Sequence, residues 1–168
     1  MLTLTEISNI EKGVYFNNEK LVGKGMSGAV YSINGGYVVK KLRSDWDKPI
    51  YNKSFRLELE TTIIPSCAKI SPKVSYHSGE RSSFNYFVMK RMDYTLYYML
   101  KNSIFINKHL VKLHNILERL NKTEYRHADL HLNNIMWSNK LDDFRIIDWG
   151  SYNKTNNKQK NKQSPKLV

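Results

Sequence analysis

The sequence predicts an α+β fold, in which a small antiparallel sheet is followed by a mostly helical region. Residues 20–42 read as three short strands, and Asn34-Gly35-Gly36 joins the second strand to the third, because Asn-Gly between β-rich runs is a strong hairpin signal. Segments 73–77 and 84–92 add two more strands to this antiparallel sheet. From Tyr94 onward the pattern is helical, and one apolar stripe recurs at spacings of three and four: Ile106, Leu110, Leu113, Leu117 and Leu120.

Two further elements complete this prediction. A helix is expected over residues 54–64, since a serine can cap its first turn and a proline follows its last residue. Within that helix Glu60 shares a face with apolar residues, so it is expected to be the more buried of the helix's acids. Residues 135–137 and 144–148 predict a hairpin with polar residues at both ends, an arrangement typical of a functional site.

The composition fits one compact unit with a basic surface. The chain has 168 residues, enough for one domain or for two small lobes that share a cleft. Hydrophobic residues make up 40% of it, which supports a core and excludes wholesale disorder. The net charge of +12 is typical of proteins that contact phosphates, nucleic acid or anionic membranes. Residues 151–168 carry five lysines and no acid, and we expect them to form a basic disordered tail.

The cellular location follows from what the sequence lacks. The single cysteine, Cys67, cannot form an internal disulfide, which favours the reducing cytoplasm. No apolar run approaches the roughly 18 to 20 residues that a membrane span needs, and the N-terminus has no secretory pattern. We therefore expect a cytoplasmic protein without a membrane span.

A glycine-rich turn and a strand lysine are the first candidates for a site. Gly23, Gly25 and Gly28 lie between two predicted strands, which disfavours a dinucleotide-binding fold, where a helix should follow the glycines. They form either a plain turn or a cover whose backbone N–H groups approach phosphate oxygens. Twelve residues later, strand alternation puts Lys40 on the same face as Val38.

The richest polar stretch is His127-Ala128-Asp129-Leu130-His131-Leu132-Asn133-Asn134, and Ile146-Ile147-Asp148-Trp149-Gly150 follows it. Together with the glycine turn, the strand lysine and the helical glutamate, these segments resemble the motifs of the protein-kinase superfamily, in the same order and spacing, over residues 21–150. The chain looks like a minimal serine/threonine kinase of the viral or pathogen-effector type. The resemblance implies a β-rich N-lobe over residues 1–92, a reduced helical C-lobe over residues 93–150 and a nucleotide cleft between them.

The resemblance also assigns roles to residues of this chain. Asp129 would accept or orient the proton of the substrate hydroxyl, Lys40 would hold the α and β phosphates of ATP, and Glu60 would orient Lys40. Asn134 and Asp148 would bind Mg²⁺. The glycines would cover the phosphates, and the remaining nucleotide contacts would come from Val22, Val30, Val38, Met89, Lys90, Met92 and Met136.

Three departures from the kinase pattern qualify these expectations. Ala128 replaces the arginine that usually reads a phosphorylated activation loop, and Trp149 replaces the common phenylalanine of the metal-binding triplet. Only 18 residues follow Gly150, so the sequence predicts that the activation segment and the later C-lobe helices are lacking. The surface that those helices would cover is expected to show apolar side chains, and to bind a partner protein or a second copy of the chain.

Several functions remain open at this stage. The leading hypothesis is an ATP- and Mg²⁺-dependent kinase that phosphorylates Ser or Thr hydroxyls of proteins, in the host cytoplasm if it is viral or an effector. The alternatives are a non-catalytic nucleotide-binding module that docks on a partner protein, and a phosphotransferase for small molecules, which the His-Ala-Asp-Leu-His form favours. Nucleic acid is not expected as the main partner, because aromatic residues are not interleaved with the basic tail. A zinc cluster of His127, Asp129 and His131 is a further alternative, since alternate residues of an extended segment point the same way.

Overall fold

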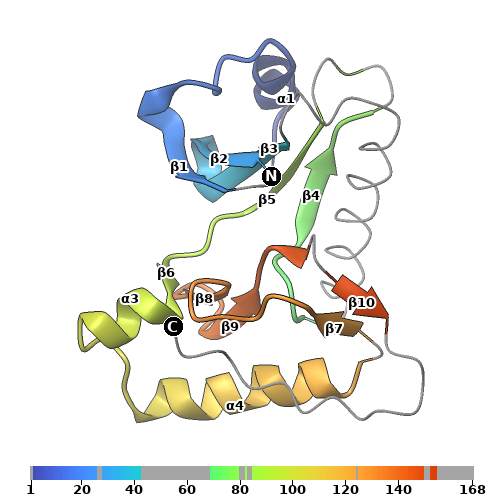
Figure 1. Ribbon diagram of the computed structural model, residues 1–168. Coiled ribbons are helices and arrows are strands. Elements are labelled where there is room, and N and C mark those ends of the chain that lie inside the picture. The colour runs from blue at the N-terminus through green and yellow to red at the C-terminus, as the bar shows by residue number, and fades with distance from the viewer. Residues whose placement is uncertain are drawn as a thin grey trace. The chain divides into compact units, whose positions relative to one another are not determined.

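The computed structural model describes residues 2–25, 28–42, 69–79, 82, 85–123, 125–149 and 152–154 (Figure 1). The chain divides into two compact units, one of residues 1–59 with 73–91 and the other of residues 60–72 with 92–168. The predicted helix over residues 54–64, Glu60 included, lies outside the described residues. The α+β class is confirmed. No helix in the described part of the chain is long and apolar enough to cross a membrane.

A five-stranded antiparallel sheet forms the first unit, with the strand order β1-β2-β3-β5-β4. Its strands confirm the five that the sequence predicts, and a 3-10 turn joins β2 to β3 at the predicted Asn-Gly-Gly turn, where Gly35 and Gly36 both adopt positive φ angles. The strands are β1 (Leu21–Lys24), β2 (Gly28–Ile33), β3 (Tyr37–Leu42), β4 (Val74–His77) and β5 (Tyr86–Lys90), and a 3-10 turn (Asn18–Lys20) precedes β1.

An unpredicted helix, α1 (Leu4–Glu11), covers one face of this sheet (Figure 1). The sequence holds a signal for it, because Thr3 and Glu6 form a reciprocal capping box at its first turn. Its last residue, Glu11, accepts a hydrogen bond from the Tyr86 hydroxyl on β5. Below the helix, aliphatic and aromatic side chains form a core of Ile10, Tyr15, Ile33, Tyr37, Val39, Tyr86 and Val88.

The opposite face of the sheet carries the residues that the sequence analysis singled out. Val38 and Lys40 lie on it, whereas Lys41 points to the α1 side, where its ammonium group lies 4.5 Å from the centre of the Phe16 ring. The predicted alternation of β3 is therefore confirmed. A second, smaller core on this face consists of Val38, Leu42, Phe87 and Met89, with Val30 and Val74 packed against it.

In the described residues of the second unit there are two helices and three short strand pairings. The helices are α3 (Leu96–Lys101) and α4 (Asn107–Asn121). The predicted hairpin is confirmed as β8 (Ile135–Ser138) and β9 (Asp143–Ile146), and the short strand β6 (Tyr94–Thr95) extends it. Its core joins the hairpin to both helices and includes Ile70, Leu96, Met99, Ile116, Leu120, Ile135, Trp137, Phe144, Ile146 and Trp149. Ile70, from the segment predicted to belong to the N-lobe, thus packs in the second unit.

The remaining strand pair corrects the prediction for the C-terminal tail. Strand β10 (Tyr152–Lys154) pairs antiparallel with β7 (Tyr125–His127), with Tyr152 opposite His127. The expectation of a disordered tail over residues 151–168 is therefore wrong for these three residues. The polar composition of the tail predicted disorder, but backbone hydrogen bonds to β7 hold these residues in a strand. The tail beyond Lys154 lies outside the described residues.

The buried face of α4 confirms the predicted stripe only in part, since Leu113, Leu117 and Leu120 pack in the core. Ile106 and Leu110 are 55% and 58% exposed, and His109 and Ile116 are buried in addition. His109 takes the core position because its ring packs edge-on against Trp137 at 4.5 Å, while its Nδ1 accepts the Ile106 N–H at 3.0 Å. Counting only aliphatic residues misses an imidazole that serves as both packing group and helix cap.

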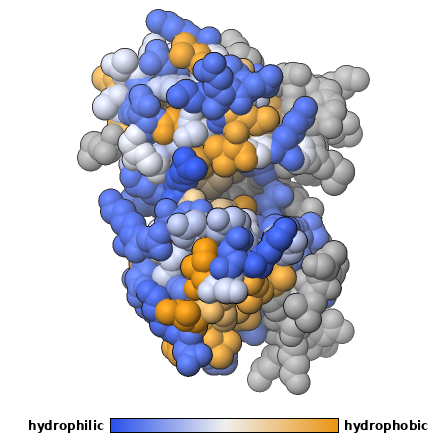
Figure 2. Space-filling view, turned by 90° about the vertical axis from the view of Figure 1, so that its left-hand side faces the viewer, coloured by the Kyte–Doolittle hydropathy of each residue, from blue (hydrophilic) through white to orange (hydrophobic). Residues whose placement is uncertain are grey.

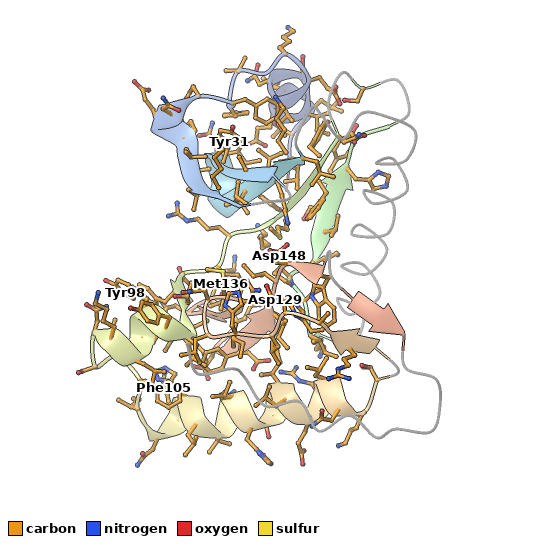
Figure 3. All side chains as sticks on the ribbon, viewed as in Figure 1. Tyr31, Tyr98, Phe105, Asp129, Met136 and Asp148 are labelled. Carbon is orange, nitrogen blue, oxygen red and sulfur yellow. The ribbon has the colours of Figure 1, made fainter. Side chains whose placement is uncertain are left out.

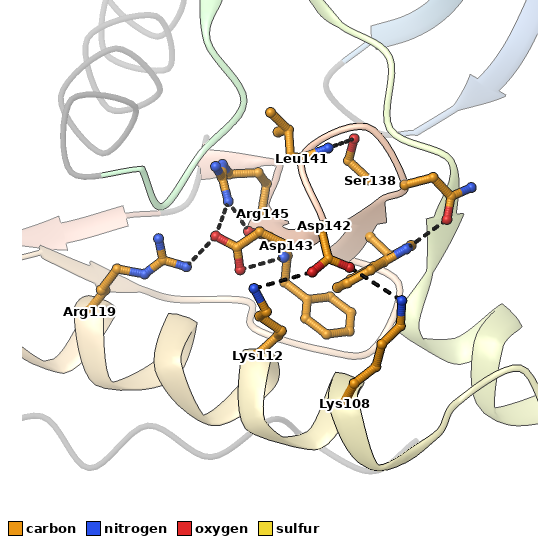
Figure 4. Close-up of polar contacts among 11 residues, drawn as sticks. Lys108, Lys112, Arg119, Ser138, Leu141, Asp142, Asp143 and Arg145 are labelled. Carbon is orange, nitrogen blue, oxygen red and sulfur yellow. Dashed lines mark hydrogen bonds and ion pairs between the residues drawn. The ribbon is translucent and has the colours of Figure 1, made fainter.

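A charged network anchors α4 to the β8–β9 hairpin (Figure 4). The Asp143 carboxylate accepts hydrogen bonds from Arg119 at 2.9 Å and Arg145 at 2.8 Å. Burial would raise the pKa of Asp143, but the hydrogen bonds from the two arginines outweigh it and lower that pKa. At the exposed end of the hairpin, Lys108 and Lys112 both pair with Asp142. The network holds the hairpin against α4. The segments of the candidate site lie directly before β8 and directly after β9.

Candidate active site

His127 joins the two polar segments of the second unit. It ends β7 and is buried, and its Nε2 lies 2.9 Å from the backbone oxygen of Ile147. Because a carbonyl oxygen can only accept, Nε2 carries the proton, and burial lowers the pKa of the ring so that it stays neutral. The described residues offer no partner to its buried Nδ1. His127 thus supports the loop that follows it.

Asn134 closes that loop from the other end. Its side-chain Nδ2 donates to the backbone oxygen of Asp129 at 3.0 Å, and its backbone N–H donates to the oxygen of His131. Its own backbone oxygen accepts the Ile147 N–H at 2.9 Å. The side chain is buried, yet its Oδ1 accepts no hydrogen bond from the described residues. This oxygen therefore remains available to a ligand.

Two exposed carboxylates accompany Asn134. Asp129 and Asp148 lie on the side of the unit away from α4 (Figure 3). Asp148 has a left-handed backbone with φ of 62°, a conformation that costs a non-glycine residue about 1 to 3 kcal/mol and that clusters at functional sites. An amide oxygen and a carboxylate are ligands that Mg²⁺ prefers, so Asn134 and Asp148 fit the predicted metal role by their donor chemistry.

The geometry gives no support to the zinc alternative. Both nitrogens of His127 are withdrawn from a ligand role, since Nε2 donates to Ile147 and Nδ1 is buried. Within the described ranges no three His, Cys, Asp or Glu side chains gather in a group that could hold a metal ion. The first histidine of the His-x-Asp-x-His stretch, His127, therefore has a structural role in its loop.

Trp149 follows Asp148 directly and anchors the segment that carries this carboxylate. Its ring is buried, meets the His127 ring edge-on at 4.9 Å, and donates its Nε1–H to the backbone oxygen of Ile146 at 2.9 Å. A phenylalanine could make the ring contact but not the hydrogen bond. The indole of Trp149 therefore adds a hydrogen bond between the segment that carries Asp148 and the end of β9.

Burial of two neutral histidines predicts that acid destabilises the second unit. Desolvation lowers the pKa of His109 and of His127 below the ordinary value of 6.5. The unfolded chain therefore binds protons first as the pH falls below 6.5, so the full stability is present above that pH and is lost progressively below it. Urea unfolding at about pH 8 and about pH 5.5 should show a lower midpoint in acid. The variant His109→Gln should reduce this difference; an equal midpoint at both pH values would contradict the prediction.

The first unit supplies the glycine turn, whose three glycines are not equivalent. The N–H of Gly25 donates to the oxygen of Gly28 at 2.9 Å and closes the turn between β1 and β2. A Cβ on Gly28 would collide with the backbone of Lys41 and Leu42, whereas a Cβ on Gly23 or Gly25 would meet no atom of the described residues within 4 Å. Gly28 is therefore required by strand packing, and the other two glycines are not.

This difference gives a paired prediction for the glycine turn. We expect Gly28→Ala to lower the free energy of unfolding by about 1 to 3 kcal/mol, because β3 must shift to admit the methyl group. Gly25→Ala should change stability by less than about 0.5 kcal/mol and instead weaken binding of MgATP. Urea titration and a fluorescent ATP analogue measure the two effects. Wild-type stability of Gly28→Ala would refute the packing argument, and wild-type ATP binding of Gly25→Ala would remove the phosphate-cover role.

Lys40 is a buried lysine of the first unit. Only 7% of it is exposed, on the strand face that also carries Val38, and its cross-strand neighbours are Val30 and Phe87. Lysines are almost never fully buried unless they are paired. Of the predicted nucleotide contacts, the structure brings Val30, Val38 and Met89 together beside Lys40.

The other predicted contacts are placed differently. Val22 is half exposed on β1, and the Lys90 ammonium group lies 3.5 Å from the centre of the Tyr37 ring, on the α1 side of the sheet. Met92 and Met136 belong to the second unit, where Met92 is buried and Met136 lies on β8. Glu60 lies outside the described residues, so its pairing with Lys40 stays a prediction.

Sequence reasoning missed two parts of this site. One is the backbone of Ile147, whose oxygen accepts from the His127 ring and whose N–H donates to the Asn134 oxygen; main-chain partners leave no signal in residue type. The other is the pairing of His131 with Asp129, at 3.7 Å. Here the signal was available, because residues two apart on an extended segment share a side.

No protein-family model matches the chain, and no curated protein shows significant sequence similarity to it.

Exposed aliphatic side chains form a patch where α3 is followed by α4. Leu100, Ile104, Ile106 and Leu110 are each more than a third exposed. Figure 2 shows apolar side chains gathered on the side of the second unit that carries α3 and the segment leading to α4. The expectation of apolar side chains on the surface that the lacking helices would cover stays a prediction, whereas an exposed apolar patch of this kind, here called the α3–α4 patch, can serve as an interaction surface.

Proposed function

We propose that this protein is a minimal protein kinase, which transfers the γ-phosphate of ATP to serine or threonine hydroxyls. The observation that carries the proposal is the 127–134 loop with Asp148. It combines an exposed aspartate, a buried asparagine whose amide oxygen is available, and a second exposed aspartate in a left-handed backbone. A purely structural loop has no physical need for this combination, whereas phosphoryl transfer needs a group to orient the nucleophile and oxygen ligands for a cation.

In the proposed reaction Asp129 accepts the proton of the acceptor hydroxyl. The hydroxyl oxygen then forms its bond to the γ-phosphorus, the bond from phosphorus to the bridging oxygen breaks, and ADP leaves. Asn134 and Asp148 would hold Mg²⁺, which neutralises charge that develops on the transferred group. The first unit would contribute Lys40 to the α and β phosphates and the glycine turn as their cover. Because Ala128 stands where kinases usually have the arginine that binds a phosphorylated activation loop, the proposed activity does not depend on such a phosphorylation.

Transfer of labelled γ-phosphate from MgATP tests this function. Wild-type protein should label itself or a generic acceptor such as casein, and Asp129→Ala should not. Asp93→Ala is the matched control, because Asp93 is also an exposed aspartate of the second unit but only caps the backbone N–H of Asn139. Label that persists in Asp129→Ala would overturn the assignment. Absence of label from all three proteins would favour the second candidate below.

The second candidate is a non-catalytic kinase-like module, and the α3–α4 patch favours it. An exposed aliphatic surface stabilises a complex when a partner protein covers it. The partner would be another protein or a second copy of this chain. Sedimentation at increasing concentration distinguishes the two, since a dimer through the patch would dissociate in the variant Leu110→Ser. A concentration-independent monomer would remove the homodimer.

A further inference from the structure

The imidazole of His131 is oriented by the backbone of its own loop. Its Nδ1 lies 3.2 Å from the backbone nitrogen of Asn133. Because a backbone N–H only donates, Nδ1 must accept, and the neutral ring then carries its proton on Nε2. That nitrogen lies 3.7 Å from Oδ2 of Asp129. The loop therefore aims an N–H donor at the carboxylate of the proposed base.

Asp129 has no comparable contact in the rest of the described chain. Its side chain is 59% exposed, and its carboxylate accepts no hydrogen bond from the described residues. The backbone oxygen of Asp129 is held by Asn134, which fixes the main chain but leaves the side-chain torsions free. An exposed carboxylate with two free torsions populates several rotamers, and catalysis requires one of them.

We propose that His131 is a positioning residue for Asp129. The separation of 3.7 Å is too long for a hydrogen bond in the free protein, and we expect it to shorten when substrate binds, as contacts of catalytic groups commonly do. In that complex Nε2 would donate to Oδ2 and so leave Oδ1 for the acceptor hydroxyl. This inference rests on the proposed kinase function, since it assigns His131 a role through Asp129 and not a contact with ATP.

Steady-state kinetics of two variants test the positioning role. We expect His131→Ala to lower kcat by about 10-fold to 100-fold with the KM for ATP unchanged, the size usual for loss of a residue that orients a catalytic group. His131→Gln should recover most of kcat, because its amide nitrogen can donate from nearly the place of Nε2. His114→Ala is the matched control, since His114 also pairs with a carboxylate, Glu118 at 3.5 Å, but on the exposed side of α4.

The outcomes separate this inference from the function on which it rests. Wild-type kcat in His131→Ala, while Asp129→Ala is inactive, would overturn the positioning role and leave the kinase. A raised KM for ATP, or a loss in His131→Gln equal to that in His131→Ala, would also overturn it. Absence of Asp129-dependent transfer in the wild type would overturn the kinase and the positioning role together.

A spectroscopic measurement gives a readout that does not depend on turnover. Long-range ¹H–¹⁵N spectra of the imidazole report which ring nitrogen carries the proton. We expect the Nε2–H tautomer for the imidazole of His131, because its Nδ1 accepts the N–H of Asn133. The Nδ1–H tautomer would contradict the orientation and the proposal with it.

Discussion

Replacing Asp148 by asparagine is expected to lower phosphoryl transfer at least about 100-fold while leaving the fold intact. The change removes the negative charge of a proposed Mg²⁺ ligand, and loss of one electrostatic contact to the transferring group typically costs a factor of about 100 to 1,000. Asparagine tolerates the left-handed backbone that Asp148 adopts, so the variant isolates charge from strain. Labelled-phosphate transfer measures the effect, and circular dichroism checks the fold.

Asp142→Asn is the matched control for this experiment. Asp142 is another exposed aspartate of the second unit with a positive φ, 46°, and its partners are Lys108 and Lys112. We expect it to retain wild-type transfer. Activity of Asp148→Asn within a few-fold of the wild type would show that Asp148 is not a metal ligand.

Lys40→Met extends the test to the first unit. Methionine keeps the length and the apolar stem of the buried side chain, so it removes mainly the charge that would pair with the phosphates. Transfer should be lost in this variant and kept in Lys41→Met, its neighbour on the other face of β3. Equal activity of the two variants would remove Lys40 from the proposed site.

The elements of this protein were predictable where one local pattern decides them. Strand alternation placed Val38 and Lys40 on one face, and the Asn-Gly-Gly turn located the hairpin between β2 and β3. Both signals act over a few residues and do not depend on the path of the chain. Helix α1 was equally readable from the capping box of Thr3 and Glu6, although its short length hides it among the polar residues of the N-terminus.

The parts that sequence reasoning misplaced depend on contacts between distant segments. His109 is buried because its ring packs against Trp137 and Phe144 of the hairpin. Strand β10 forms because Tyr152–Lys154 pairs with the edge of β7. In the candidate site, residue types indicated Asp129, Asn134 and Asp148, but the ties between them run through main-chain atoms. Residue identity alone could not predict these hydrogen bonds, because main-chain atoms are common to every residue.

Trp149 gives the largest stability effect that we expect from a single substitution. Its ring is fully enclosed between His127 and the core of the second unit, so Trp149→Ala should lower the free energy of unfolding by about 3 to 5 kcal/mol through lost burial and the cavity that remains. Trp149→Phe keeps the ring contact but leaves the Ile146 oxygen without its donor, which should cost about 1 to 3 kcal/mol. Urea unfolding followed by circular dichroism measures both variants.

The two variants also separate packing from function at the site. Trp149→Phe should keep phosphoryl transfer, because phenylalanine still supports His127 and the backbone of Asp148. Tyr97→Ala, at an exposed aromatic of α3, is the control and should change stability by less than about 0.5 kcal/mol. If Trp149→Ala lowers the free energy of unfolding no more than this control does, the ring does not stabilise the segment that carries Asp148. A stable but inactive Trp149→Phe would instead show that the indole N–H, by fixing the end of β9, sets the position of Asp148.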